Sequence, residues 1–121
     1  MKQIKDYIVE KYLISKDTKS ETDPENPSTW DVGDILVGIL SYSMTLVKFY
    51  KIKRRTAKKF DVVEVGQKLT KGSWMEGECI ADPDKEGEKN SGRLNKWNRV
   101  VIDGYRCKFW DGQPVWFTHL D

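Results

Sequence analysis

Residues 41–65, SYSMTLVKFYKIKRRTAKKFDVVEV, place strand-forming residues beside a run of cations. The first half of this stretch, TLVKFYKIKRR (45–55), has the aromatic and β-branched content that is typical of a strand. KKFDVVEV (58–65) repeats that composition after a short basic turn. The stretch therefore predicts two strands joined by a tight connection.

The alternation of apolar residues slips within the first of these strands. Val47 and Phe49 would share one face of the strand, and Tyr50 and Ile52 would share the other. A single bulge near Phe49–Tyr50 would place all four side chains on one core, since a bulge inserts one extra residue into the pleat.

Further strand signals lie on both sides of this stretch. GDILVGIL (33–40) is a short apolar run after a Gly-Asp turn, and Gly38 within it indicates a bulge or a close backbone approach. NRVVI (98–102) and YRCKFW (105–110) predict two strands joined through a turn at Asp103-Gly104. CKFWDGQPVWFT (107–118) is the strongest hairpin signal of the chain, with Asp111-Gly112 between two aromatic-rich arms and Pro114 at the start or edge of the last strand.

These elements predict a mainly β domain with one N-terminal helix, an α+β chain. Five to six short antiparallel strands suggest a small SH3-like or partly open barrel, which would also remove exposed sheet edges. We expect an amphipathic helix within residues 1–14, a polar linker over 15–29, and the barrel over 30–121 with a long charged loop near 76–96.

Composition places the chain among ordinary soluble domains. Its 121 residues are enough for one core, and it has no apolar run long enough to cross a bilayer, so we expect no membrane partner. Only two cysteines occur, Cys79 and Cys107, without a CxxC or a paired histidine, which fits a reducing compartment. We therefore expect a cytoplasmic protein, and the sequence leaves its oligomeric state open.

The cations are concentrated in one segment. Seven basic and no acidic residues lie between Lys48 and Lys59, which leaves 14 basic against 19 acidic residues elsewhere. One interpretation is the solvated face of a hairpin, with Arg54 and Arg55 on an exposed turn. The other is a docking surface for nucleic acid or an acidic host protein. The candidate anion-binding residues are Lys51, Lys53, Arg54, Arg55, Lys58 and Lys59.

Five tryptophans are many for this length, and core packing is one explanation for them. Alternatively, some line an exposed groove of the kind with which small barrels grip peptides or bases. Tyr42, Trp110 and Trp116 are the candidate groove residues.

No complete catalytic, metal or cofactor motif is present, so we expect a non-catalytic protein without cofactor. Cys107 and His119 are a conceivable nucleophile and base, but nothing indicates a third, orienting residue. Residues 82–93, DPDKEGEKNSGR, match the start of a calcium-binding loop but hold Arg93 where a bidentate Glu is required. That segment predicts a structural loop and no metal site.

GDILVGILSYSMTLVKFYKI and the later WDGQPVW resemble a small uncharacterised family that is common in bacteriophages and other mobile elements. The resemblance covers roughly residues 31–118. Ser41, Met44 and Leu46 stand where that family has Gly, Gln and Asn. It implies a phage setting and a barrel, and it transfers no activity. The matching positions are Gly33, Asp34, Tyr42, Thr45, Phe49, Tyr50, Trp110, Asp111, Gly112 and Pro114.

These observations together predict a small binding module that acts in the bacterial host cytosol on an acidic partner. The alternative is a phage inhibitor of a host defence system that acts by protein–protein binding or by nucleotide sequestration. A structural or accessory virion protein is a third possibility, and fold alone does not choose among them.

Overall fold

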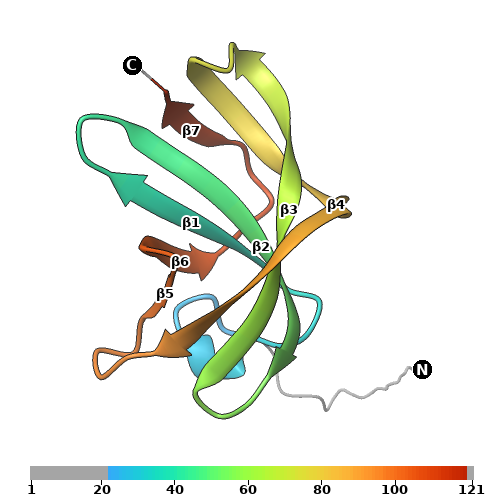
Figure 1. Ribbon diagram of the computed structural model, residues 1–121, viewed down its shortest axis with the longest axis vertical. Coiled ribbons are helices and arrows are strands. Elements are labelled where there is room, and N and C mark those ends of the chain that lie inside the picture. Colours follow the sequence, from blue (N-terminus) through green and yellow to red (C-terminus); the bar gives the residue numbers. More distant parts are fainter. Residues whose placement is uncertain (1–21, 120–121) are drawn as a thin grey trace.

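The computed structural model describes residues 22–119, which form seven strands and one short 3-10 helix (Figure 1). The domain is therefore mainly β, as predicted, although it has seven strands where five or six were expected. The elements are the 3-10 helix η2 (Pro27–Thr29), β1 (Ile35–Ser41), β2 (Thr45–Arg55), β3 (Lys59–Gly72), β4 (Glu76–Leu94), β5 (Val100–Ile102), β6 (Tyr105–Phe109) and β7 (Val115–Thr118).

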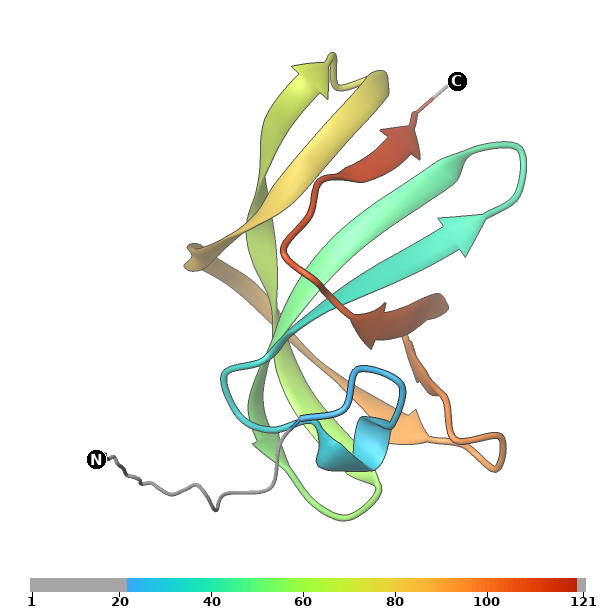
Figure 2. The same ribbon diagram turned by 180° about the vertical axis from the view of Figure 1, so that it is seen from behind.

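All strand pairings are antiparallel and belong to one sheet of order β3-β2-β1-β6-β5-β4-β7. Strand β3 also pairs with β4, so the pairings of β1 to β6 close into a ring. Strand β7 lies outside this ring, on the free edge of the first part of β4. Both views show the β3–β4 hairpin extending well beyond the ring (Figures 1 and 2).

Two cores lie on the two faces of the β1–β2–β3 meander. The first receives residues from every strand of the ring, with Leu94, Cys107 and Phe109 partly buried at its border. The second lies between the outer face of the meander and the start of β4 with β7. The first core holds Trp30, Leu36, Tyr50, Ile52, Phe60, Val62, Val100 and Ile102. The second holds Val37, Val47, Phe49, Val63, Val65, Cys79, Ala81 and Phe117.

This double burial corrects the predicted bulge at Phe49–Tyr50. Val47 and Phe49 do share one face and Tyr50 and Ile52 the other, but each pair enters its own core. No bulge is needed, because both faces of β2 are covered. The irregularity that β2 does contain falls later, between Ile52 and Arg54.

The long charged loop predicted near residues 76–96 is wrong, because residues 76–94 form the longest strand of the sheet. Most side chains from Asp84 to Lys89 are exposed, so this part of β4 is held by backbone pairing with β3 and shows no apolar pattern. Pro83 is tolerated because the ladder is irregular there: Asp82 pairs with Gly66, whereas the next paired residue is Glu86.

The predicted hairpin over residues 107–118 is also wrong. Strand β6 pairs with β1 along one edge and with β5 along the other, and a strand has only two edges. The chain therefore crosses over after Trp110, and β7 pairs with β4, with Val115 opposite Cys79.

The predicted turn at Asp103-Gly104 is confirmed: both residues have positive φ, 51° and 82°, as a tight two-residue hairpin requires.

The helix predicted within residues 1–14 lies outside the described residues, as does the first part of the predicted linker over 15–29. The remainder of that linker is packed against the domain: Pro27 is buried in η2, and Trp30 enters the first core. Asn26 caps η2 by accepting a hydrogen bond from the Ser28 amide at 3.2 Å.

The close approach predicted at Gly38 is present: side chains of other strands lie against the backbone of β1 at this position. A Cβ atom at Gly38 would lie 2.9 Å from Tyr105 Cβ and 3.1 Å from the Tyr50 ring. The Tyr50 ring therefore occupies the space above Gly38, and its hydroxyl is buried without a hydrogen-bond partner among the described residues. Burial also raises the pKa of Tyr50 above its usual value, with smaller contributions from Cys107 and Glu64.

Replacing Tyr50 by phenylalanine is expected to raise the free energy of unfolding by about 1 kcal/mol, since an unsatisfied buried hydroxyl costs roughly 1–3 kcal/mol. Urea denaturation of Tyr50→Phe and the parent protein measures the difference. A loss of stability of similar size would contradict the prediction, because it would show that the hydroxyl is hydrogen-bonded in solution.

Candidate functional site

The predicted anion-binding lysines at the centre of β2 are paired with a carboxylate of this chain. Lys51 Nζ lies 2.8 Å and Lys53 Nζ 3.1 Å from the same oxygen of Glu86 on β4. The hydrogen bond from Lys51, followed by that from Lys53, lowers the pKa of Glu86. These two cations therefore face an internal anion.

The next cations share Asp61 on β3. Arg54 Nη2 lies 3.1 Å and Lys59 Nζ 3.8 Å from the two oxygens of this carboxylate. Lys58 is the member of the predicted set that is exposed and forms no ion pair with another described residue. The basic run of the sequence is thus largely neutralised by β3 and β4.

Arg55 has a structural role that its neighbours lack. Its guanidinium donates to the carbonyls of Ser28 at 3.0 Å, Pro27 at 3.3 Å and Trp30, so it ties the end of β2 to η2. Its Cζ atom also lies 4.7 Å from the centre of the Phe60 ring. The expectation that Arg55 lies on an exposed turn is therefore wrong.

The predicted aromatic groove is not assembled. Tyr42 is exposed in the β1–β2 turn and Trp116 is exposed on β7, whereas Trp110 packs edge-on against Phe49 with ring centres 5.2 Å apart. The Trp110 indole also donates to the Gln113 carbonyl at 2.8 Å. No aromatic contact among the described residues joins any two of Tyr42, Trp110 and Trp116.

The two thiols are far from ionisation at neutral pH. Burial raises the pKa of Cys79 to about 11 and that of Cys107 to about 12. The Cys107 thiol donates to the Tyr105 carbonyl at 3.5 Å, while the His119 ring packs against Phe117. The conceivable Cys107–His119 pair is therefore not formed in this structure.

The most exposed tryptophan of the described residues, Trp97, is presented by a well-defined turn between β4 and β5. The Asn95 side chain accepts from the backbone amides of Trp97 at 2.9 Å and Arg99 at 3.0 Å. The Asn95 amide donates to the Arg99 carbonyl at 2.9 Å, and Asn98 takes a positive φ of 61°. The turn thus holds an indole that is 68% exposed.

One cation contacts this indole, and others lie on strands β4 and β6. Lys96 Nζ lies 4.7 Å from the centre of the Trp97 ring, and Arg93 is paired across the sheet with Val101, which in turn is opposite Arg106. Directly opposite residues project from the same face of a sheet, so Arg93, Val101 and Arg106 form one exposed row. We call this surface the Trp97 platform; it comprises Arg93, Lys96, Trp97, Arg99, Val101 and Arg106.

Two features of the platform distinguish its cations from those of the basic run. None of its four cations forms an ion pair with a carboxylate of the described residues. In addition, Arg93 lies directly opposite Lys59, and like charges in that position repel each other. An anion placed on this surface would relieve that repulsion.

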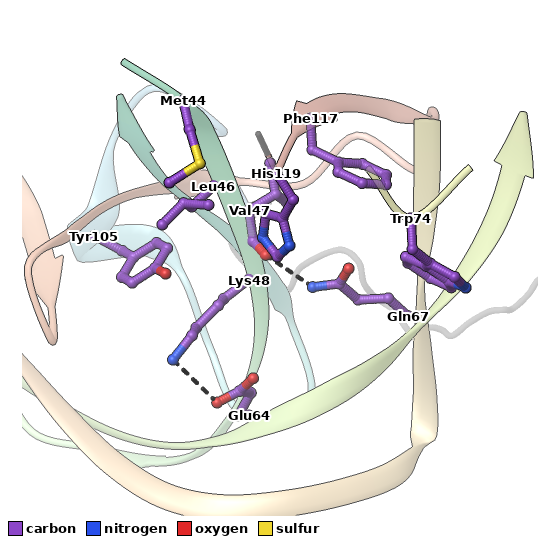
Figure 3. Close-up of a pocket in the computed structure, with 10 residues that line it drawn as sticks. All are labelled: Met44, Leu46, Val47, Lys48, Glu64, Gln67, Trp74, Tyr105, Phe117 and His119. Carbon is purple, nitrogen blue, oxygen red and sulfur yellow. Dashed lines mark hydrogen bonds and ion pairs between the residues drawn. The ribbon is translucent and has the colours of Figure 1, made fainter. Parts of the chain in front are cut away.

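A pocket of about 410 Å³ lies at the other end of β4, where β3 separates from β2 (Figure 3). Gln67 spans the gap: its Nε2 donates to the Val47 carbonyl at 2.8 Å. Figure 3 shows aromatic side chains on both sides of the opening. The pocket is lined by Met44, Leu46, Val47, Lys48, Glu64, Gln67, Trp74, Tyr105, Phe117 and His119.

Sequence reasoning missed both surfaces. Trp97 could have been found from its setting, KWNR, in which an indole stands between cations in a turn-forming context. The pocket gave no such signal, because Trp74, Tyr105 and His119 come from three separate parts of the chain.

Comparison with protein-family models, curated proteins and solved structures finds no match to this chain. Within the described residues 22–119, no helix has the length and apolar character needed to cross a bilayer.

Proposed function

We propose that this chain is a small non-catalytic binding module whose acidic partner is single-stranded nucleic acid, held on the Trp97 platform. The observation that carries the proposal is an exposed indole on a fixed turn, with Lys96 over its ring, next to strands whose exposed arginines lack carboxylate partners in the described residues. Bases of any identity stack on such a ring, and clustered cations gain affinity by releasing counterions from phosphates.

The geometry favours this surface over the basic run of β2 and β3. A phosphate that approaches Lys51, Lys53 or Arg54 must displace a carboxylate already in place. The platform cations carry no such competitor among the described residues. In this proposal the ring of β1 to β6 is a small SH3-like or partly open barrel, and the protein acts in the bacterial cytosol as the product of a phage or mobile element.

The test is fluorescence anisotropy with a labelled oligothymidylate of about 15 nucleotides. Four phosphate contacts on a single strand give a log–log salt slope near −2.8, so binding should weaken about fiftyfold between 50 and 200 mM salt. Trp97→Ala should remove roughly 1–3 kcal/mol of stacking. Arg93→Glu combined with Arg106→Glu should abolish binding.

The matched control is Lys68→Glu combined with Lys85→Glu. It makes the same change in net charge at exposed sites on the other half of the β3–β4 hairpin, and it should leave affinity nearly unchanged. Equal losses in both double variants would show binding without a defined surface and would contradict the proposal. Binding of poly-glutamate in place of oligothymidylate would identify an acidic protein as the partner and would also overturn it.

A further inference from the structure

The pocket at the far end of β4 is separate from the Trp97 platform, and its chemistry is different. Its lining includes Met44 of the β1–β2 turn and Trp74 of the β3–β4 turn (Figure 3). A volume of about 410 Å³ is within the range of small-molecule sites. Any ligand here would occupy a site independent of the proposed function.

One wall of the pocket is aromatic. The Trp74 ring lies 5.8 Å from the Phe117 ring, and the His119 ring meets Phe117 at 6.0 Å with a T-shaped geometry. Trp74 is 52% exposed, so much of its indole is available to a ligand. Indole and phenyl faces carry negative quadrupole potential and attract cations, above all when water is partly excluded.

Lys48 and Glu64 line the other end of the pocket, and Asp103, which lies outside the lining, is a second carboxylate near Lys48, so these three charges together are net negative. Lys48 Nζ lies 3.6 Å from Glu64 and 3.8 Å from Asp103, so one ammonium group is shared by two carboxylates. Both distances exceed hydrogen-bonding range, so neither carboxylate is saturated by Lys48. Lys48 also lies over the Tyr105 ring, at 5.1 Å from its centre.

The remaining polar group, Gln67, is already engaged. Its Nε2 donates to the Val47 carbonyl, and its Oε1 accepts from the Cys79 thiol at 3.5 Å. Gln67 therefore acts as a fixed wall of the pocket. The groups left to hold a ligand are the aromatic faces and the two charged side chains of the lining, Lys48 and Glu64.

We propose that this pocket binds an organic ammonium ion with an aromatic body, with the ring against Trp74 and the ammonium group directed to Glu64. Charge complementarity favours this class, because the cluster of Lys48, Glu64 and Asp103 is net negative and Glu64 is the carboxylate that lines the pocket. The Met44 and Leu46 side chains supply the apolar contact for the body of the ligand.

The test compares three indoles that differ in one terminal group: tryptamine, tryptophol and indole-3-propionate. Isothermal titration calorimetry with the full chain should give the order tryptamine, then tryptophol, then indole-3-propionate, with tryptamine about threefold or more tighter than tryptophol. Equal affinity for tryptamine and tryptophol, tightest binding of indole-3-propionate, or no saturable binding of tryptamine would each overturn the proposal.

Three variants test which residues hold the ligand. Glu64→Gln should remove the preference for tryptamine while leaving tryptophol binding unchanged, because it deletes the charge and keeps the shape. Trp74→Ala should weaken all three ligands. Trp116→Ala is the matched control, since this exposed indole on β7 does not line the pocket, and an equal loss in this variant would overturn the assignment of the ligand to the pocket.

Discussion

Replacing Phe49 by alanine is expected to lower the free energy of unfolding by about 3–5 kcal/mol, because the ring is fully buried. Phe49 stands near the middle of β2, packs edge-on against Trp110, and belongs to the core between the meander and β4 with β7. Truncation leaves a cavity that the other residues of this core would have to fill.

Urea and thermal denaturation measure the effect, and the melting temperature should fall by about 10 °C or more. Val32→Ala is the control: this residue is exposed, so its truncation should change stability by less than about 0.5 kcal/mol. A loss below about 1 kcal/mol for Phe49→Ala would contradict the second core, since it would mean that the ring is solvated on that face.

Replacing Arg55 by alanine should destabilise the protein by about 2–4 kcal/mol, since a charged donor bonded to several carbonyls is lost and those carbonyls are left partly buried. The guanidinium fastens η2 and Trp30 to the end of β2 and stacks on Phe60. Both effects bear on the first core, which contains Trp30 and Phe60.

The adjacent Arg54 provides a control with the same chemistry and charge. Its side chain is 78% exposed and pairs with Asp61, so Arg54→Ala should cost no more than about 1 kcal/mol. Chemical denaturation of the two single variants under the same conditions gives the comparison. Equal effects in the two variants would refute the anchoring role of Arg55.

The parts of the fold that sequence could predict are those with local signals. The bounds of β2 follow from its aromatic and β-branched run, and the β5–β6 hairpin follows from Asp103-Gly104, where both residues must adopt positive φ. The close packing at Gly38 follows from a glycine inside an apolar strand. Each of these features is set by residues that are neighbours in the chain.

The parts that sequence could not predict depend on distant partners. Strand β4 has the composition of a loop, and only its pairing with β3 makes it a strand. The partner of Lys51 is Glu86, 35 positions away, so the basic run looked unpaired in the sequence. Similarly, Asp111-Gly112 signals a turn but does not show which strand pairs with the segment after it. Because both edges of β6 are occupied by β1 and β5, that segment pairs elsewhere.

The double burial of β2 changes how the register of this sheet is specified. In a strand with one wet face, a slip of one residue drives apolar side chains into water, and that penalty fixes the pairing. A slip of β2 would instead exchange Phe49 and Tyr50 between two apolar interiors, so the penalty falls on the lysines: Lys48 would enter the place of Phe49, or Lys51 that of Tyr50, depending on the direction. The correct register of β2 must therefore be selected by residues that cannot change places without loss.

Those residues are Lys48 and Lys51 of β2 and Gly38 of β1. A slip would remove Lys48 from Glu64 and Lys51 from Glu86, and it would carry the Tyr50 ring off the space that Gly38 leaves open. The ion pairs that neutralise the basic run thus help to fix the register of β2. Their contribution therefore includes the selection of one register, which a measurement of their strength alone would not reveal.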